Sequence, residues 1–294
     1  MRVAVTGASG LIGSALVPAL RAAGHDVLCL VRREPDSADE AAWDPTAGTI
    51  DEGALAGVGA IVNLAGVDIG QRWTHETRQR IRDSRVDGTR LLAETVSRLD
   101  PRPALLLASA VGYYGQRGDE ELTEESAAGE GFLADVVREW EAAADPARAA
   151  GARVMHFRQG LVLAKDGGAL KRMLLPFRLG VGGRIGSGSQ WWSWDSLDDV
   201  VAAYLHALEQ PLEGVYNLAA PGLVRNRDFV DALGRALHRP TAFPLPGFAV
   251  KLAFGEMGEE MLLGGQRVVP ERLTETGFAF AHPDVRGALE HVLE

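Results

Sequence analysis

Residues 2–13 read Arg-Val-Ala-Val-Thr-Gly-Ala-Ser-Gly-Leu-Ile-Gly, a short apolar run followed by three glycines at every third position. The run predicts a buried strand over residues 2–6, and the glycines predict a turn that opens a helix reaching about Ala23. Gly24 is a typical helix stop, and residues 26–31 predict a second apolar strand. Because apolar strands joined by a helix pair in parallel with both faces covered, these residues predict the first unit of an α/β sheet.

The same alternation of strands and helices continues along the first half of the chain. The further strands and helices are predicted over residues 60–64, 74–98, 104–109, 132–149 and 153–157. This order is typical of the Rossmann arrangement, a doubly wound parallel sheet with helices on both faces. Beyond residue 160 the pattern changes, with a glycine-rich loop at 180–189, a strand at 215–218, a helix at 226–237 and short helices from 248 onward.

The sequence therefore predicts an α/β protein with two parts. We expect a nucleotide-binding Rossmann domain over residues 1–160, to which a segment at about 190–220 returns. We expect a smaller α+β domain on the substrate side over residues 161–294, with a mainly helical tail at about 247–294.

Composition excludes several classes of protein. The 294 residues are 46% hydrophobic and 24% charged, which is ordinary for a globular enzyme and excludes disorder of the whole chain. The net charge of −10 argues against a nucleic-acid partner. No apolar run has the length of a membrane helix, no signal peptide is present and Cys29 stands alone, so we expect a cytoplasmic protein with no membrane partner. No histidine or cysteine spacing predicts a metal site.

The glycine-rich turn predicts a dinucleotide site. Glycine permits positive φ and a close backbone approach to a pyrophosphate, which the free N–H groups of the following helix then bind. An NAD site usually carries an acid about 20 residues further on, but here Arg32 and Arg33 end the second strand, and Arg suits the 2′-phosphate of NADP(H). Small residues after the third strand add to the site. The predicted cofactor residues are Gly7, Ser9, Gly10, Leu11, Ile12, Gly13, Arg32, Arg33, Leu64, Ala65 and Gly66.

The chain resembles a known family along its full length. The first half is similar to the extended short-chain dehydrogenase/reductases of the NAD-dependent epimerase/dehydratase superfamily. The whole chain is similar to an atypical branch that is loosely described as nucleoside-diphosphate-sugar epimerases or cell-division-inhibitor-like proteins. The sequence segments that carry the resemblance are Asn63-Leu64-Ala65-Gly66, Arg72-Trp73, Ser84-Arg85, Ser109-Ala110-Val111-Gly112-Tyr113-Tyr114-Gly115, Trp140-Glu141, Gln190-Trp191-Trp192-Ser193-Trp194 and Leu237-His238-Arg239-Pro240.

The resemblance implies NADP(H) binding and a smaller carboxy-terminal domain over the cleft. It places Arg85 where extended relatives carry a cofactor-facing Asn, and Leu161 beside the nicotinamide. Relatives that transfer hydride use a Tyr and a Lys four residues apart on one helix, together with a Ser or Thr. None of the four tyrosines of this chain is followed by Lys at that spacing, and alignment on Trp140-Glu141 puts Leu133 and Val137 at the two positions.

The remaining catalytic candidates are Ser109 at a strand end, which also belongs to the predicted cofactor shell, and Tyr113 and Tyr114 on the loop that follows. Each has a plainer interpretation, a turn-capping hydroxyl for Ser109 and aromatic packing for the tyrosines. Arg158 ends its strand beside the expected cleft, as a substrate anchor or as the partner of a carboxylate.

The substrate candidates beyond Arg158 lie in one segment rich in glycine and tryptophan. Arg184 suits a phosphate or carboxylate, and Trp191 and Trp192 suit a sugar or a planar group, although a tryptophan-rich hinge that packs two domains is equally consistent. The favoured hypothesis is an NADP(H)-dependent oxidoreductase or epimerase that acts on a small polar, sugar-nucleotide-like substrate without the usual Tyr–Lys pair. The alternative is a non-catalytic NADP(H)-binding redox sensor. Either protein is expected to be a monomer or a homodimer.

Overall fold

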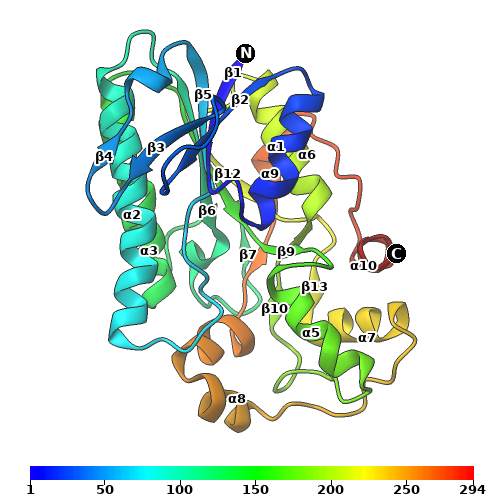
Figure 1. Ribbon diagram of the computed structural model, residues 1–294. Coiled ribbons are helices and arrows are strands. Elements are labelled where there is room, and N and C mark those ends of the chain that lie inside the picture. The colour runs from blue at the N-terminus through cyan, green and yellow to red at the C-terminus, as the bar shows by residue number, and fades with distance from the viewer.

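Eight strands form one sheet in the upper half of the computed structural model, which describes residues 1–294 (Figure 1). The strand order across the sheet is β12 (Gly214–Leu218), β8 (Val154–Gln159), β6 (Ala104–Ala110), β5 (Val58–Asn63), β1 (Arg2–Thr6), β2 (Asp26–Val31), β3 (Glu40–Asp44) and β4 (Thr49–Ile50). All neighbours pair in parallel except β3 and β4, which pair antiparallel. This arrangement confirms the predicted doubly wound sheet.

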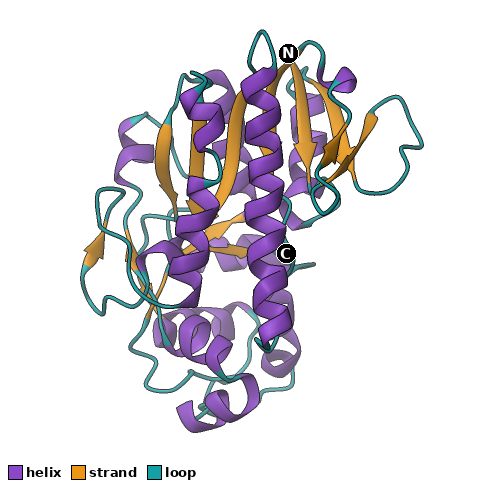
Figure 2. Cartoon of the chain, turned by 90° about the vertical axis from the view of Figure 1, so that its left-hand side faces the viewer, coloured by secondary structure: helices purple, strands orange, loops and turns teal.

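Helices cover both faces of the sheet, and Figure 2 shows the longest of them, α2, lying across one face. The helices of this part are α1 (Leu11–Ala22), α2 (His75–Arg98), α3 (Phe132–Ala142), α4 (Asp145–Ala149) and α6 (Leu197–Glu209). Side chains alternate along β1: Val3 and Val5 pack with Leu16 of α1 on one face, and Ala4 packs in the cluster that contains Leu92 of α2 on the other. Burial of each such Leu or Val contributes about 1.5–3 kcal/mol.

Two local features of the large sheet and its helices differ from the sequence-based prediction. The helix predicted over residues 132–149 is interrupted between α3 and α4, and α4 restarts with Pro146 in its first turn, where proline is favoured. Strands β3 and β4 were not predicted at all. In β3 the side chain of Trp43 is buried against Gly88 of α2, where an added Cβ would lie only 3.2 Å from the indole ring. Tertiary packing therefore stabilises a strand that is too short to recognise by periodicity.

The remaining elements lie mostly below the sheet in Figure 1 and are short. They are η1 (Gly53–Leu55), η2 (Val111–Tyr114), β7 (Glu121–Leu122), β9 (Leu161–Leu163), α5 (Gly168–Arg178), β10 (Trp191–Trp192), β11 (Trp194–Ser196), β13 (Val224–Arg225), α7 (Asn226–Ala236), α8 (Gly247–Phe254), the π-helix η3 (Gly258–Leu263), β14 (Arg267–Val268), α9 (Glu271–Glu275) and α10 (Val285–Leu293). Their strands form three two-stranded pairs, and a second apolar core forms around Trp192, Trp194 and Phe229. No helix combines the length and the apolar composition that a bilayer crossing needs.

Candidate functional site

The glycine-rich loop, the turn between β1 and α1, packs so closely that only glycine fits at positions 7 and 13. Gly7 has a φ of +66°, and a Cβ on it would lie 2.8 Å from the carbonyl carbon of Leu64 at the end of β5. A Cβ on Gly13 would lie 2.2 Å from the Gly7 carbonyl oxygen. Ser9 and Gly10 are exposed, whereas Leu11 and Ile12 are half-buried. The N-terminus of α1 has no side-chain cap and no acid in its first turn, an arrangement that suits a bound anion.

The two arginines after β2 have different surroundings. Arg33 pairs with Glu40, with Nη2 to Oε1 at 2.6 Å, and with Asp36 at 3.0 Å. Arg32 is exposed and makes neither an ion pair nor a side-chain hydrogen bond within the protein. The guanidinium of Arg32 is thus available to an external anion, whereas that of Arg33 is engaged.

A buried polar network holds the end of β5 next to the glycine-rich loop. Asn63 Oδ1 accepts a hydrogen bond of 2.6 Å from the Thr6 hydroxyl, and Asn63 Nδ2 donates to Thr89 Oγ1 of α2 at 3.0 Å. The Thr6 hydroxyl oxygen also accepts from the Leu64 N–H at 3.2 Å. These bonds fix the backbone from which the half-buried Leu64 and Ala65 project.

Arg85 of α2 lies directly beneath this turn. It donates to the carbonyl oxygens of Ile81 and Val67, each at 3.1 Å, and a Cβ on Gly66 would lie 3.2 Å from its Cζ. Its Cζ also lies 5.3 Å from the ring centroid of Trp140. No carboxylate pairs with Arg85, and burial lowers the pKa of its guanidinium to about 10. Such a partly desolvated cation next to the predicted cofactor turn is a candidate for a functional role.

Ser109 is the penultimate residue of β6 and is shielded from solvent. Its buried hydroxyl donates to Glu141 Oε1 at 2.6 Å, and Glu141 in turn accepts two hydrogen bonds from Arg158, of 2.9 and 2.8 Å. Of the two alternatives for Arg158, the structure shows the carboxylate pair, with the side chains of Arg158 and Glu141 only 4% and 12% exposed. Burial acts to raise the pKa of Glu141, but the hydrogen bonds and charge of Arg158 outweigh it, so the net pKa is lowered.

The two adjacent tyrosines have different environments. Tyr114 is fully buried; its oxygen accepts from Arg158 Nη1 at 3.0 Å and its hydroxyl donates to Asn217 Oδ1 at 2.6 Å. Burial raises the pKa of Tyr114, against the lowering effect of Arg158. Tyr113 is half-buried, its ring centroid lies 3.3 Å from Arg158 Cζ, and no protein group bonds its hydroxyl. Tyr113 is therefore the tyrosine of this pair with a free phenol.

The helix positions where relatives carry the Tyr–Lys pair are apolar. Val137 is buried in α3 and Leu133 lies in its first turn, half-buried. The N–H groups of Phe132 and Leu133 donate to the carboxylate of Glu260 in η3, at 3.0 and 3.1 Å. The carboxy-terminal segment thus caps the helix from which a proton relay would otherwise project. Sequence reasoning missed Glu260, because no spacing signal connects it to α3.

The predicted substrate residues have dissimilar surroundings. Arg184 is exposed. Trp191 is half-buried, its Nε1 donates to Asp119 Oδ1 at 2.7 Å, and Arg225 Cζ lies 4.3 Å from its ring centroid. Trp192 is buried against Phe229 with centroids 5.2 Å apart, which favours the packing interpretation of this tryptophan. Leu161, half-buried in β9, pairs with Trp194 of β11 and donates its N–H to the Ser193 oxygen at 2.8 Å.

An open pocket of about 710 Å³ adjoins the glycine-rich loop. The segment after β9 and the starts of α5 and α6 form its other walls. Its lining comprises Ser9, Gly10, Leu11, Ser14, Leu163, Ala164, Lys165, Asp166, Gly167, Gly168, Leu197, Asp198, His291 and Val292. A Cβ on Gly167 would lie 2.4 Å from Leu11 Cδ1, so the pocket wall packs directly on the loop.

Comparisons with known proteins agree with this architecture. Residues 3–219 match the NAD dependent epimerase/dehydratase family, and residues 245–292 match a domain of unknown function, DUF1731. The chain is 49% identical over 290 residues to epimerase family protein Mb2239 of Mycobacterium bovis, covering 98% of this chain and 96% of that protein. It is 39% identical over 301 residues to epimerase family protein SDR39U1 of Homo sapiens, covering 100% of both.

Solved structures give the same result. A crystal structure of human epimerase family protein SDR39U1 (isoform2) with NADPH superposes with a TM-score of 0.89 at 37% identity, covering 99% of both chains. The nucleoside-diphosphate sugar epimerase from Corynebacterium glutamicum matches with a TM-score of 0.83 at 36% identity, covering all of this chain and 58% of that one. These matches confirm the resemblance found in the sequence, and the chain belongs to the NAD-dependent epimerase/dehydratase family.

Proposed function

We propose that this protein binds NADP(H) along the glycine-rich loop and uses it in an oxidoreductase or epimerase reaction on a small polar substrate. The observation that carries the proposal is the pairing of an uncapped α1 N-terminus with the unpaired Arg32. The backbone N–H groups of α1 would bind the pyrophosphate, and Arg32 would bind the 2′-phosphate. The presence of NADPH in the human relative's crystal structure supports the same cofactor.

The bound cofactor would supply or accept a hydride. The chain itself must then hold the substrate and move a proton without a Tyr–Lys pair. Tyr113 is the proposed proton donor, because its hydroxyl has no partner within the protein while Arg158 stacks on its ring at 3.3 Å. Ser109, Glu141 and Tyr114 would act as positioning residues, since they are bonded to each other or to Arg158 and are largely buried.

A non-catalytic NADP(H) sensor is the second candidate. It is favoured by Leu133 and Val137, which occupy the relay positions and carry no transferable proton. Comparison of Tyr113→Phe with Tyr114→Phe in a screen of carbonyl compounds and nucleotide sugars distinguishes the two. If the protein is an enzyme, we expect turnover of at least one substrate class, and Tyr113→Phe should abolish this turnover while NADPH still binds. If the protein is a sensor, we expect tight NADPH binding and no turnover with any substrate class.

Binding itself is tested by titration of cofactor-free protein with NADPH and NADH, with tryptophan fluorescence as the signal. We expect NADPH to bind at least about tenfold more tightly than NADH, because Arg32 adds a charge-assisted contact worth about 1.5–3 kcal/mol. Arg32→Asp should reverse this preference, whereas Arg90→Asp, the same charge change at an exposed position on α2, should leave it unaltered. Equal affinity for the two cofactors would refute the role of Arg32, and no binding of either would refute the proposal.

A further inference from the structure

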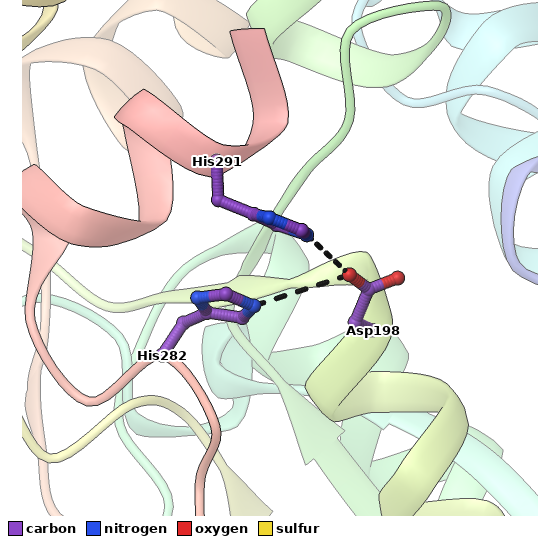
Figure 3. A group of neighbouring side chains, drawn as sticks. All are labelled: Asp198, His282 and His291. Atoms are coloured by element: carbon purple, nitrogen blue, oxygen red, sulfur yellow. Dashed lines mark hydrogen bonds and ion pairs between the residues drawn. The ribbon is translucent and has the colours of Figure 1, made fainter. Parts of the chain in front are cut away.

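Two histidines and one aspartate from separate segments meet beside α6 (Figure 3). Asp198 lies in the first turn of α6, His282 lies in the loop before α10, and His291 lies on α10. One ligand atom from each residue lies within 4.8 Å of the other two. Asp198 and His282 lie 84 positions apart in the sequence, which explains why spacing alone predicts no metal site here.

We propose that Asp198, His282 and His291 bind a divalent transition-metal ion of the Zn²⁺ class. Two imidazoles and one carboxylate are a ligand set that Zn²⁺ accepts, whereas Mg²⁺ and Ca²⁺ prefer oxygen ligands. With three protein ligands, a tetrahedral ion would keep one position open for water. Zinc bonds of about 2.0–2.2 Å place tetrahedral ligand atoms about 3.3 Å apart.

The distances in the structure bracket that separation. Asp198 Oδ2 lies 2.8 Å from His291 Nε2 and 3.9 Å from His282 Nε2, and both rings turn these nitrogens toward the carboxylate in Figure 3. The two rings are stacked with centroids 4.3 Å apart, so binding requires them to splay. His291 can rotate in this way because its side chain is 48% exposed and its hydrogen bond goes to Asp198 alone.

The surrounding contacts place the ligands in advance of binding. The buried carboxylate of Asp199 accepts from the N–H groups of Ala281 and His282, at 2.6 and 3.1 Å, which holds the His282 loop against the start of α6. At the other end of the cluster, Lys165 Nζ donates to the Leu293 oxygen at 3.1 Å and fixes the end of α10. The positive end of α6 disfavours a cation, but the charges of Asp198 and Asp199 offset it.

The ion would link two parts of the molecule. Asp198 belongs to a helix that covers the large sheet, whereas α10 packs on α7 and contributes to the second core. Because Asp198 and His291 also line the pocket beside the glycine-rich loop, the ion would fix the far wall of that pocket.

The test uses untagged protein that has been stripped with a chelator, titrated with Zn²⁺ and separately with Mg²⁺ by calorimetry. We expect one equivalent of Zn²⁺ to bind, no Mg²⁺ to bind, and a rise in Tm of about 5 °C at a hundredfold excess of Zn²⁺ over Kd. His282→Ala and His291→Ala should each weaken zinc binding at least about tenfold, because even second-shell losses weaken binding 10- to 100-fold. His75→Ala removes an exposed histidine elsewhere and should change nothing.

Hydrogen exchange provides an independent readout. Zinc should slow amide exchange in α10 of the wild-type protein and have no such effect in Asp198→Asn. Absence of zinc binding to the wild-type protein would overturn the proposal, as would equal affinity in the wild type and all variants, which would identify adventitious surface zinc. If metal-free His291→Ala has a lower Tm than the metal-free wild type, and zinc does not change the Tm of the wild type, the cluster is only a hydrogen-bonded contact.

Discussion

Removal of the Glu141 carboxylate tests whether the network behind Ser109 stabilises the fold. Glu141→Ala leaves Arg158 buried without its partner, since the two side chains are only 12% and 4% exposed. Loss of one member of a buried ion pair costs about 3–5 kcal/mol, because the remaining charge has been taken out of water without compensation. The Ser109 hydroxyl also loses its acceptor. We therefore expect the free energy of unfolding to fall by about 4 kcal/mol.

A second glutamate of the same helix offers a matched control. Glu139 of α3 pairs with Arg82, but these side chains are 46% and 42% exposed. Glu139→Ala should cost no more than about 1 kcal/mol, because solvent screens an exposed pair. Urea denaturation followed by tryptophan fluorescence measures both variants, and Glu141→Gln provides a milder change if Glu141→Ala does not fold. A cost for Glu141→Ala within 1 kcal/mol of the control would refute the reasoning.

The pH dependence follows from the sign of the Glu141 pKa shift. Because the pKa of Glu141 is lowered below its ordinary value of 4.5 in the folded protein, its contribution is fully present above pH 4.5. The contribution is lost as the pH falls through the lower folded value. The stability difference between the wild type and Glu141→Gln should therefore shrink only below pH 4.5.

Two further predictions concern the loop and the sheet. Gly13→Ala places a Cβ 2.2 Å from the Gly7 oxygen and should abolish NADPH binding in a fluorescence titration. Gly24→Ala is the control, because Gly24 has a φ of +80° and open space around it. This control should lower the free energy of unfolding by about 1–2 kcal/mol and retain NADPH binding. His156 is buried in β8, and burial, aided by nearby arginines, lowers its pKa from 6.5 to about 3. Stability should thus be full above pH 6.5 and fall as the pH drops toward 3, by about 2 kcal/mol between pH 6.5 and 4.5. Urea denaturation at several pH values between 6.5 and 4.5 measures this loss of stability. The part of the pH dependence that is due to His156 should be absent in His156→Gln. If the midpoint of His156→Gln changes with pH as steeply as that of the wild type, the assignment to His156 is wrong.

The large sheet and the glycine-rich loop could be predicted because their signals are local. The continuous apolar run of β1 and the helical apolar period of α1 lie within a few residues of each other, and Gly7 and Gly13 mark a backbone that leaves no room for a Cβ. The break between α3 and α4 was missed because the helical pattern persists across it and Pro146 is tolerated in a first turn.

The sequence by itself determined the strand–helix alternation, the glycine cradle and the two arginines after β2, because neighbouring residues carry all of that information. Only the tertiary structure decided which of those arginines is free, that Arg158 faces Glu141, and that Trp192 lies in a core. It also brought His282 and His291 to Asp198. These partners are distant in the sequence, and a side chain's charge and shape do not specify which distant residue the folded backbone will place against it.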